Sequence, residues 1–275
     1  MKFLSTRRRH PLAGLLVVLL GLIVVGTVYS AFRPAPADAT KADSDLISQG
    51  RQLYVVGCSS CHGLNAEGIV TKDGGNYGPP LRGVGAAAVD FQVGTGRMPL
   101  AQPGTQAAAK QEEYDAAEVE ALAAYIASLS PGPAIPTAED YATDGMTVEE
   151  IVQGGAFFRT NCTACHNYAA SGGALPSGRY APSLLDVTSK HMYEAMLTGP
   201  QQMPVFSDQV LTPEDKRSVI AYINQLKTQP AYGGSSLGSL GPVSEGLWGW
   251  IVGIGTLVLV TVWIANNGVR AGGKK

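Results

Sequence analysis

Two short stretches decide the interpretation of this chain: Gly57-Cys-Ser-Ser-Cys-His62 and Asn161-Cys-Thr-Ala-Cys-His166. They contain all four cysteines of the 275-residue sequence, and in each the second cysteine is followed at once by a histidine. A cysteine pair at this spacing can be a disulfide, a thioredoxin-like dithiol or half of a zinc site. A redox dithiol favours a βαβ context, which the sequence lacks. A zinc site built from the four cysteines leaves both histidines unexplained.

The histidine after each pair favours a different chemistry, because C-x-x-C-H is the attachment motif of c-type haem. Two thiols at this spacing lie on one turn of chain and can bond to two vinyl groups along one edge of a porphyrin. The adjacent histidine then lies beneath the iron as its proximal ligand. We therefore predict two covalently bound haem c groups, attached through Cys58 and Cys61 and through Cys162 and Cys165, with His62 and His166 as proximal ligands.

The region around the two motifs is duplicated with an offset of about 104 residues. Three further pairs of segments match in the same order: Tyr77-Gly-Pro-Pro-Leu81 with Tyr180-Ala-Pro-Ser-Leu184, Arg97-Met-Pro-Leu100 with Gln202-Met-Pro-Val205, and Ala124-Tyr-Ile-Ala-Ser-Leu129 with Ala221-Tyr-Ile-Asn-Gln-Leu226. Chance would hardly preserve this order. The sequence therefore predicts two homologous domains, residues 42–130 and 146–228, joined by a linker over 131–145.

Each domain is predicted to be small and all-α. Thr147-Val-Glu-Glu150 has the form of a capping box ahead of apolar residues at helical spacing. Asp115 opens a similar run, and Thr212-Pro213 is an N-cap followed by proline at the first helical position. Each copy then has a helix that leads into C-x-x-C-H, an irregular stretch rich in glycine and proline, and a closing helix.

Methionine is the residue type that can supply a second axial ligand in both copies. Met98 lies 36 residues after His62 and Met203 lies 37 after His166, and each is followed by proline and precedes the closing helix. A ligating histidine usually donates its other N–H to a carbonyl or carboxylate, and Pro79 and Pro182 are candidates for that carbonyl, unless they only pack a turn.

The remaining candidates for axial ligands lack a counterpart in the other copy. Met192 and Met196 lie four residues apart and are expected to pack in the core, while Met146 precedes the second motif. His191 cannot serve two symmetric domains and is expected at the surface or near a haem edge. The first domain also has an insertion over Gln102–Glu113, either a docking loop or, as we favour here, a tolerated insertion.

Both ends of the chain have apolar runs. Pro11–Ala31 is uncharged for 21 residues, and about 20 apolar residues span a bilayer as a helix. Cleavage as a signal peptide is the alternative, although such apolar runs are usually shorter, about 7–15 residues. Leu247–Ala265 is a second run with tryptophans near its ends, as at membrane interfaces. We predict an anchor within residues 1–32, a linker over 229–245, a transmembrane helix over 246–266 and a tail over 267–275.

Charge is distributed unevenly along the chain. Five bases and no acids precede residue 38, three bases and no acids follow residue 245, and the middle has all 22 acids, for a net charge of about −10 there. The positive-inside rule places both termini in the cytoplasm and the haem domains on the outer face of the membrane. No basic field points to nucleic acid. The acidic middle could dock on basic partners or simply keep the region soluble.

These motifs resemble those of class I cytochrome c domains: CSSCH, GPPL at 78–81 and RMP at 97–99 in the first copy, and CTACH, APSL and QMP in the second. The order anchor, domain, domain, anchor resembles the dihaem cytochrome c subunit of the actinobacterial menaquinol–cytochrome c reductase, the cytochrome bcc complex. The first resemblance rests on specific motifs and the second on architecture.

The resemblance implies a fixed electron relay within a large supercomplex. A cytochrome b subunit oxidises menaquinol, a Rieske iron–sulfur protein reduces the haem of His62 and Met98, and the haem of His166 and Met203 reduces the copper site of a cytochrome c oxidase. The chain is then an electron-transfer subunit and not catalytic alone. The alternatives are a membrane-anchored electron donor to another respiratory enzyme, a dihaem peroxidase and a haem-based gas sensor.

Overall fold

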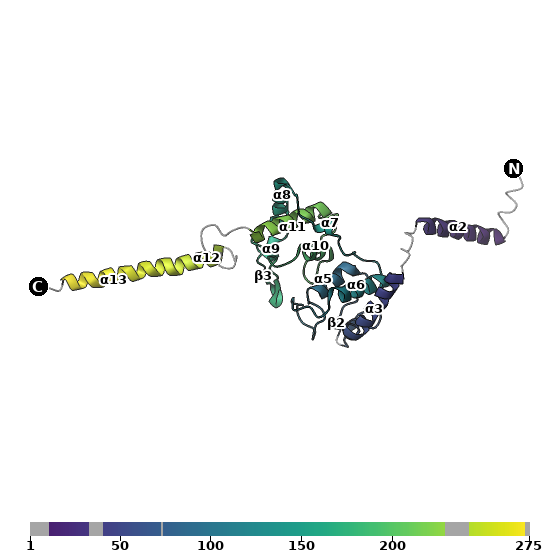
Figure 1. Cartoon of the computed structure of the whole chain (residues 1–275), viewed down its shortest axis with the longest axis horizontal. Coiled ribbons are helices and arrows are strands. Elements are labelled where there is room, and N and C mark those ends of the chain that lie inside the picture. The colour runs from purple at the N-terminus through teal and green to yellow at the C-terminus, as the bar shows by residue number, and fades with distance from the viewer. Residues whose placement is uncertain (1–10, 33–40, 73, 229–241, 273–275) are drawn as a thin grey trace. The chain divides into compact units, whose positions relative to one another are not determined.

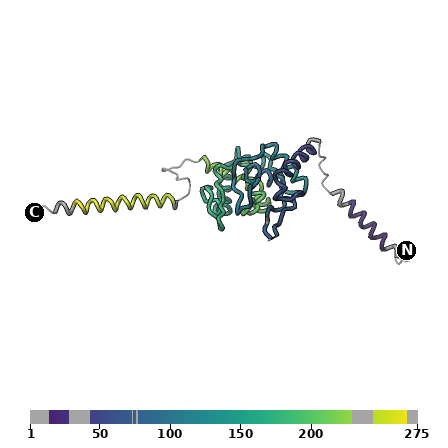
Figure 2. The backbone as a smooth tube through the Cα atoms, turned by 90° about the horizontal axis from the view of Figure 1, so that it is seen from below, coloured from purple at the N-terminus to yellow at the C-terminus, as the bar shows by residue number. Residues whose placement is uncertain are grey.

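The computed structural model describes residues 11–32, 41–72, 74–228 and 242–272 (Figures 1 and 2). The chain divides into two units, Met1–Asp45 and Leu46–Lys275, which are considered separately. The basic segment over residues 2–9 and most of the predicted linker over 229–245 lie outside the described residues. Nearly all of both predicted haem domains falls in the second unit.

The first domain is mainly helical, and its closing helix begins where the sequence predicts. The carboxylate of Asp115 accepts a hydrogen bond from the Glu118 N–H at 2.9 Å, and the Glu118 side chain accepts one from the Asp115 N–H at 3.0 Å, which completes a capping box. The elements are α3 (Lys41–Gly57), α4 (Ser59–His62), β1 (Ile69–Val70), β2 (Asn76–Gly78), α5 (Gly85–Gly94) and α6 (Ala116–Leu129).

The second domain repeats this order. The Thr147 N–H donates to the carboxylate of Glu150 at 2.7 Å, and the Glu150 N–H donates to the Thr147 hydroxyl at 3.3 Å, so the predicted capping box is confirmed. The elements are α8 (Val148–Asn161), α9 (Thr163–His166), β3 (Gly173–Leu175), the 3₁₀ turn η1 (Pro176–Gly178), β4 (Arg179–Ala181), α10 (Ser189–Thr198) and α11 (Pro213–Thr228), preceded in the linker by α7 (Ala138–Tyr141).

The all-α prediction holds for most of each domain but did not include a short hairpin. In each copy the glycine- and proline-rich stretch after the C-x-x-C-H motif contains a small antiparallel pair, β1 with β2 and β3 with β4. These strands have only two or three residues each, so they are too short to produce an alternating hydrophobic pattern. The domains are mostly helical with one short hairpin each.

Each domain has its own hydrophobic core. The first core is built around Tyr54, Leu122 and Ile126, the second around Phe158 and Ile220, and the two clusters share no residue. Met192 and Met196 are 4% and 5% exposed in the second core, which confirms that they pack there. The linker joins both, since Ile135 packs against the first core and Tyr141 against the second.

Two glycines at equivalent positions allow the first and last helices of each domain to cross closely. A Cβ atom added to Gly50 of α3 would lie 1.9 Å from the carbonyl oxygen of Ala121, and one added to Gly154 of α8 would lie 1.9 Å from that of Ser218. Aromatic pairs flank both crossings, Tyr54 with Tyr125 and Phe158 with Tyr222. Only glycine, which has no Cβ atom, fits at positions 50 and 154 in such close crossings.

Gly154→Ala is expected to destabilise the second domain. The new methyl group would meet the backbone of α11, which cannot move aside as a side chain can, and overpacking of this kind costs about 1–3 kcal/mol. Gly94→Ala is the matched control, because the nearest atom to its added Cβ is 3.7 Å away. Thermal unfolding followed by absorbance measures both variants, and equal midpoints would contradict the close crossing.

One helix among the described residues is long and apolar enough to cross a membrane. Ser244–Asn267 has 24 residues with a mean hydropathy of 2.0, and none of its most apolar stretch is buried. It comprises most of α12 (Pro242–Trp248), a π-helical segment η3 (Gly249–Ile254) and the first part of α13 (Gly255–Gly272). At the other end α2 (Pro11–Phe32) contains a shorter apolar stretch, Gly14–Thr27.

Candidate haem centres

The first C-x-x-C-H motif forms a single helical turn directly after α3. The His62 N–H donates to the carbonyl of Cys58 at 3.0 Å, and the His62 carbonyl in turn accepts from the Gly68 N–H at 2.8 Å. His62 is 8% exposed, and its Nδ1 lies 2.7 Å from the carbonyl oxygen of Pro79. The imidazole is therefore held at one nitrogen, within a fixed backbone frame.

The second motif repeats these contacts. The His166 N–H donates to the Cys162 carbonyl at 2.9 Å, and the His166 carbonyl accepts from the Gly172 N–H at 2.9 Å. Its Nδ1 lies 3.0 Å from the carbonyl oxygen of Pro182. The segments after the two prolines are also anchored in the same way. The Leu81 N–H donates to the carbonyl of Ala66 at 2.9 Å, and the Leu184 N–H donates to the carbonyl of Ala170 at 2.8 Å.

Donation from Nδ1 to a carbonyl fixes the tautomer, so the lone pair of each ring lies on Nε2. Burial lowers the pKa of His166, an effect partly offset by the hydrogen bond to Pro182. The neutral form that a metal ligand requires is thus favoured at neutral pH. An imidazole with Nδ1 fixed and Nε2 available fits the proximal position of a haem iron.

The four thiols form no disulfide, and Cys58 and Cys162 lack the character of redox-active cysteines. Burial, and after it the neighbouring thiol of each pair, raises the pKa of Cys58 and of Cys162 to about 11, whereas a reactive cysteine has a lowered pKa. Cys58 and Cys162 each pack against the core of their own domain. The pairs therefore fit thioether attachment of a buried cofactor better than thiol–disulfide exchange.

Met98 and Met203 lie in the loops that follow α5 and α10. Both are half-buried, and Met98 packs against the first core while Met203 packs against the second. Their backbones are held by hydrogen bonds from Met98 N–H to Gln92 at 2.9 Å and from Met203 N–H to Pro200 at 3.0 Å. Each methionine thus shares a core with one C-x-x-C-H motif.

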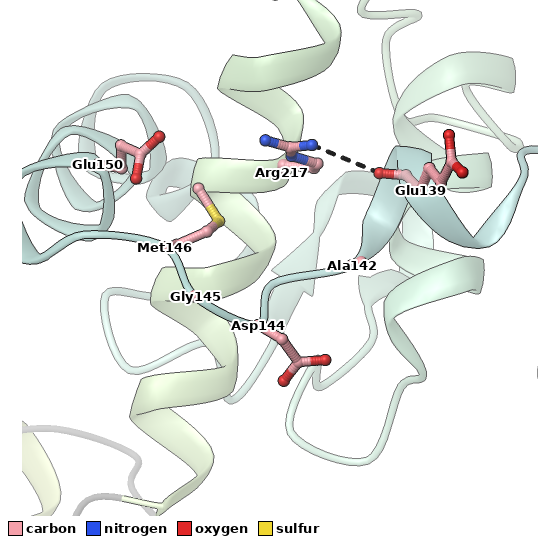
Figure 3. A pocket seen from close by; sticks show the side chains of 7 residues that line it. All are labelled: Glu139, Ala142, Asp144, Gly145, Met146, Glu150 and Arg217. Atoms are coloured by element: carbon pink, nitrogen blue, oxygen red, sulfur yellow. Dashed lines mark hydrogen bonds between the residues drawn. The ribbon is translucent and has the colours of Figure 1, made fainter.

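Met146 lies in a different environment. It lines an open pocket between the linker and the second domain, together with Glu139, Asp144, Glu150 and Arg217, whose guanidinium donates to the carbonyl of Glu139 at 3.5 Å (Figure 3). No predicted iron ligand lines this pocket. The position agrees with the view that Met146 is not an axial ligand.

The sequence suggested that His191 could lie on a free surface. In the structure it does not. It lies at the start of α10, where the second domain contacts α5 of the first. Its ring meets Phe91 edge-on with 6.0 Å between ring centroids, and its Nε2 lies 4.0 Å from carboxylate oxygens of both Asp90 and Glu194. The ammonium of Lys190 lies 2.7 Å from Asp90. This polar cluster belongs to the interface between the domains.

Glu194 is the fully buried member of this cluster. Its carboxylate oxygens lie 3.9 Å from the Lys190 ammonium and 4.0 Å from Nε2 of His191. Burial first, and Asp90 second, raise the pKa of Glu194 to about 9, although Lys190 opposes the shift. The side chain is therefore a neutral acid at pH 7 when the protein is folded, and it is ionised at that pH in the unfolded chain.

Glu194→Gln is expected to stabilise the protein increasingly as pH rises from 5 to 9. Because the pKa is raised on folding, the folded state keeps a proton that the unfolded state releases above about pH 4.5. The wild type therefore loses stability as pH rises from about 4.5 to about 9. A permanently neutral amide at this position does not. Thermal midpoints at several pH values measure the difference. Exposed Glu120→Gln is the control, and parallel curves for Glu194→Gln and the wild type would refute the prediction.

Two family models match separate stretches of the chain. Residues 47–130 match the family model described as cytochrome c, and residues 149–223 match the one described as cytochrome c oxidase, cbb3-type, subunit III. The chain is 41% identical over 272 residues to the cytochrome bc1 complex cytochrome c subunit of Corynebacterium efficiens, covering 94% of this chain and 90% of that protein.

Mycobacterial relatives give the same result. The cytochrome bc1 complex cytochrome c subunit of Mycobacterium bovis is 39% identical over 262 residues, with 94% of this chain and 92% of that protein covered. That of Mycobacterium leprae is 39% identical over 260 residues, with 93% and 87% covered. The chain belongs to the family of cytochrome c subunits of the cytochrome bc1 complex and is an electron-transfer cytochrome of that oxidoreductase complex.

Proposed function

We propose that the chain carries two covalently bound haem c groups with His62 and Met98 as iron ligands in the first domain and His166 and Met203 in the second. The observation that carries this proposal is the repeated proximal site, in which a buried histidine is anchored through Nδ1 to a proline carbonyl directly after a cysteine pair. One-electron exchange at iron is the chemistry that such a group supplies when bound.

The protein's own residues restrict the site to that chemistry. The proline carbonyls of Pro79 and Pro182 orient the imidazoles, and Met98 and Met203 would fill the opposite axial positions. If these residues hold the iron on both sides, no site would be left for oxygen, peroxide or carbon monoxide to bind it. Methionine ligation also favours a high reduction potential. These properties favour a relay over the peroxidase and gas-sensor alternatives.

The proposed relay runs from the first domain to the second. A Rieske iron–sulfur protein, itself reduced at a cytochrome b subunit, delivers an electron to the domain of His62 and Met98. The electron continues to the domain of His166 and Met203 and from there to the copper site of a cytochrome c oxidase. The names of the relatives support membership of a cytochrome bc1 complex, while the partner at the oxidase end rests on the resemblance to the bcc complex.

The apolar ends would tether this relay to the membrane. We propose that α2 and the helix containing Ser244–Asn267 both span it, with both termini in the cytoplasm and the two haem domains on the outer face. Two anchors keep the domains at a high effective concentration near membrane-bound partners, which replaces the diffusion of a free cytochrome.

Purification of the tagged full-length chain from membranes in a mild detergent, followed by mass spectrometry, tests the proposal. We expect cytochrome b, the Rieske protein and cytochrome c oxidase subunits to co-purify. Recovery of a dehydrogenase or another oxidase in their place would favour the alternative of a different respiratory partner. On the isolated subunit, carbon monoxide binding or peroxide turnover would instead indicate an open iron site.

A further inference from the structure

The insertion Gln102–Glu113 of the first domain contacts the second domain. It lengthens the segment from Met98 to Tyr125 to 27 positions, against 19 from Met203 to Tyr222. The loop was expected to be a tolerated insertion, but Ala107 within it is only 7% exposed. Its hydrogen bonds explain this burial.

Gln106 binds the backbone of the second domain through both ends of its amide. Its Nε2 donates to the carbonyl oxygen of Tyr180 at 2.6 Å, and its Oε1 accepts from the N–H of Tyr180 at 2.9 Å. Tyr180 is the middle residue of β4. The side chain of Gln106 therefore pairs with a strand of the other domain in the way that a neighbouring strand would.

Gln201 makes the reciprocal contact from the second domain. Its Oε1 accepts from the N–H of Ala107 at 3.0 Å, and its Nε2 donates to the carbonyl oxygen of Ala107 at 2.9 Å. The guanidinium of Arg179 adds a bond to the carbonyl of Thr105 at 3.2 Å and holds Gln202 at 3.0 Å. Three consecutive loop residues are thus fixed by five bonds across the interface.

The bound residues lie next to both candidate axial ligands of the second domain. Tyr180 lies two residues before Pro182, whose carbonyl holds His166. Gln201 lies two residues before Met203. On the first domain, Lys110 of the same loop donates to the carbonyl of Pro99, the residue after Met98, at 2.6 Å. The loop therefore connects the segment holding Met98 with the segments holding His166 and Met203.

A second contact between the domains lies apart from the loop. The ion pair of Lys190 with Asp90 and the edge-on contact of His191 with Phe91 join α10 to α5. Figure 1 shows α5 and α10 side by side, as their contacts require. Two separate attachments restrain the distance and the orientation of the two domains more than either would alone.

We propose that the loop Gln102–Glu113 is a clamp that sets the relative placement of the two haem sites, with Gln106 and Gln201 as its positioning residues. The clamp rests on the proposed function, since it matters for electron transfer only if each domain holds a haem. Electron tunnelling slows steeply with the distance between redox centres. A clamped pair of domains would keep that distance constant.

Gln106→Ala combined with Gln201→Ala tests the clamp in the full-length holoprotein. In the wild type, the amides of Ala107 and Tyr180 are expected to be protected from hydrogen exchange by the side chains that bind them. The double variant should lose this protection while amides in the cores of both domains keep theirs. Gln102→Ala, in an exposed residue of the same loop that makes none of these contacts, is the matched control. Unchanged protection in the double variant overturns the clamp.

The consequence for the two haems is measured on the same proteins. Pulsed electron paramagnetic resonance should give one narrow interhaem distance for the wild type and for Gln102→Ala, and a broader, longer distribution for the double variant. Because electron tunnelling slows steeply with the distance between redox centres, electron equilibration between the haems after a reducing flash should be slower in the double variant than in the wild type and Gln102→Ala. A narrow, unchanged distance with an unchanged rate overturns the positioning role.

Two further readouts separate failure of the clamp from failure of the proposed function. Haem content and the methionine–iron band are expected to be the same in all variants, because none of the substituted glutamines touches an iron ligand directly. Fewer than two haems in the wild type would contradict the proposed function, and the exchange measurement would still decide whether the clamp exists. Gln106→Glu keeps the acceptor of the Tyr180 N–H and loses only the donor to the Tyr180 carbonyl, so it should lower the protection of the Tyr180 amide less than Gln106→Ala does.

Discussion

Met98→Ala is expected to abolish the methionine–iron absorption band of one haem and to leave that of the other unchanged. Met98 packs against the core of the first domain, whose C-x-x-C-H motif is separate from that of the second, so its loss opens only one axial position. The reduction potential of that haem should fall by on the order of 0.1 V, part of the roughly 0.8 V that axial ligands control. Spectra in the red region and redox titration measure both effects.

Met203→Ala should have the same effect on the other haem. The variant with both Met98→Ala and Met203→Ala should lose the band entirely. Met146→Ala is the control, since Met146 lines a pocket away from every predicted ligand. Retention of both bands in Met98→Ala, or loss of one in Met146→Ala, would show that the distal ligands are assigned wrongly. Carbon monoxide should bind only the haem whose methionine is removed.

The parts of the fold that were predictable from the sequence have local signals. The capping boxes that begin at Asp115 and Thr147 each involve only four consecutive residues and mark the start of a helix. Both occur in the structure. The burial of Met192 and Met196 followed from their spacing on one helical face. Gly50 and Gly154 went unnoticed, yet they lie at the same offset of about 104 residues as the two motifs, so extending the repeat upstream would have found them.

The contacts between the domains could not be predicted in this way. Gln106 and Gln201 are common polar residues, and each contacts a residue 74 or 94 positions away. Nothing in the local sequence distinguishes such a contact from an exposed polar loop. The linker shows the same difficulty, because the carbonyl of Pro133 accepts a hydrogen bond from Ala87 in α5 and thereby ties the linker to the first domain.

Replacing Cys58 and Cys61 by serine is expected to reduce the haem content to one per chain, and replacing Cys162 and Cys165 should have the same effect. Without either thiol of a pair no thioether bond can form, so that domain loses its covalent cofactor. Because the two cores share no residue, the other domain should keep its haem. Haem quantification and intact mass measure the ratio, with Ser60→Ala, which keeps both thiols, as the control.

The two serine variants also decide the direction of electron flow, because they interrupt the relay at different points. If electrons enter at the first domain, the Cys58/Cys61 variant in the assembled complex should no longer be reduced by quinol, although a small chemical reductant still reduces its remaining haem. The Cys162/Cys165 variant should be reduced by quinol but fail to pass electrons to the oxidase. The reverse pattern would exchange the roles of the two domains, while loss of both haems in either variant would mean that the interface of Gln106 and Gln201 makes the domains one folding unit.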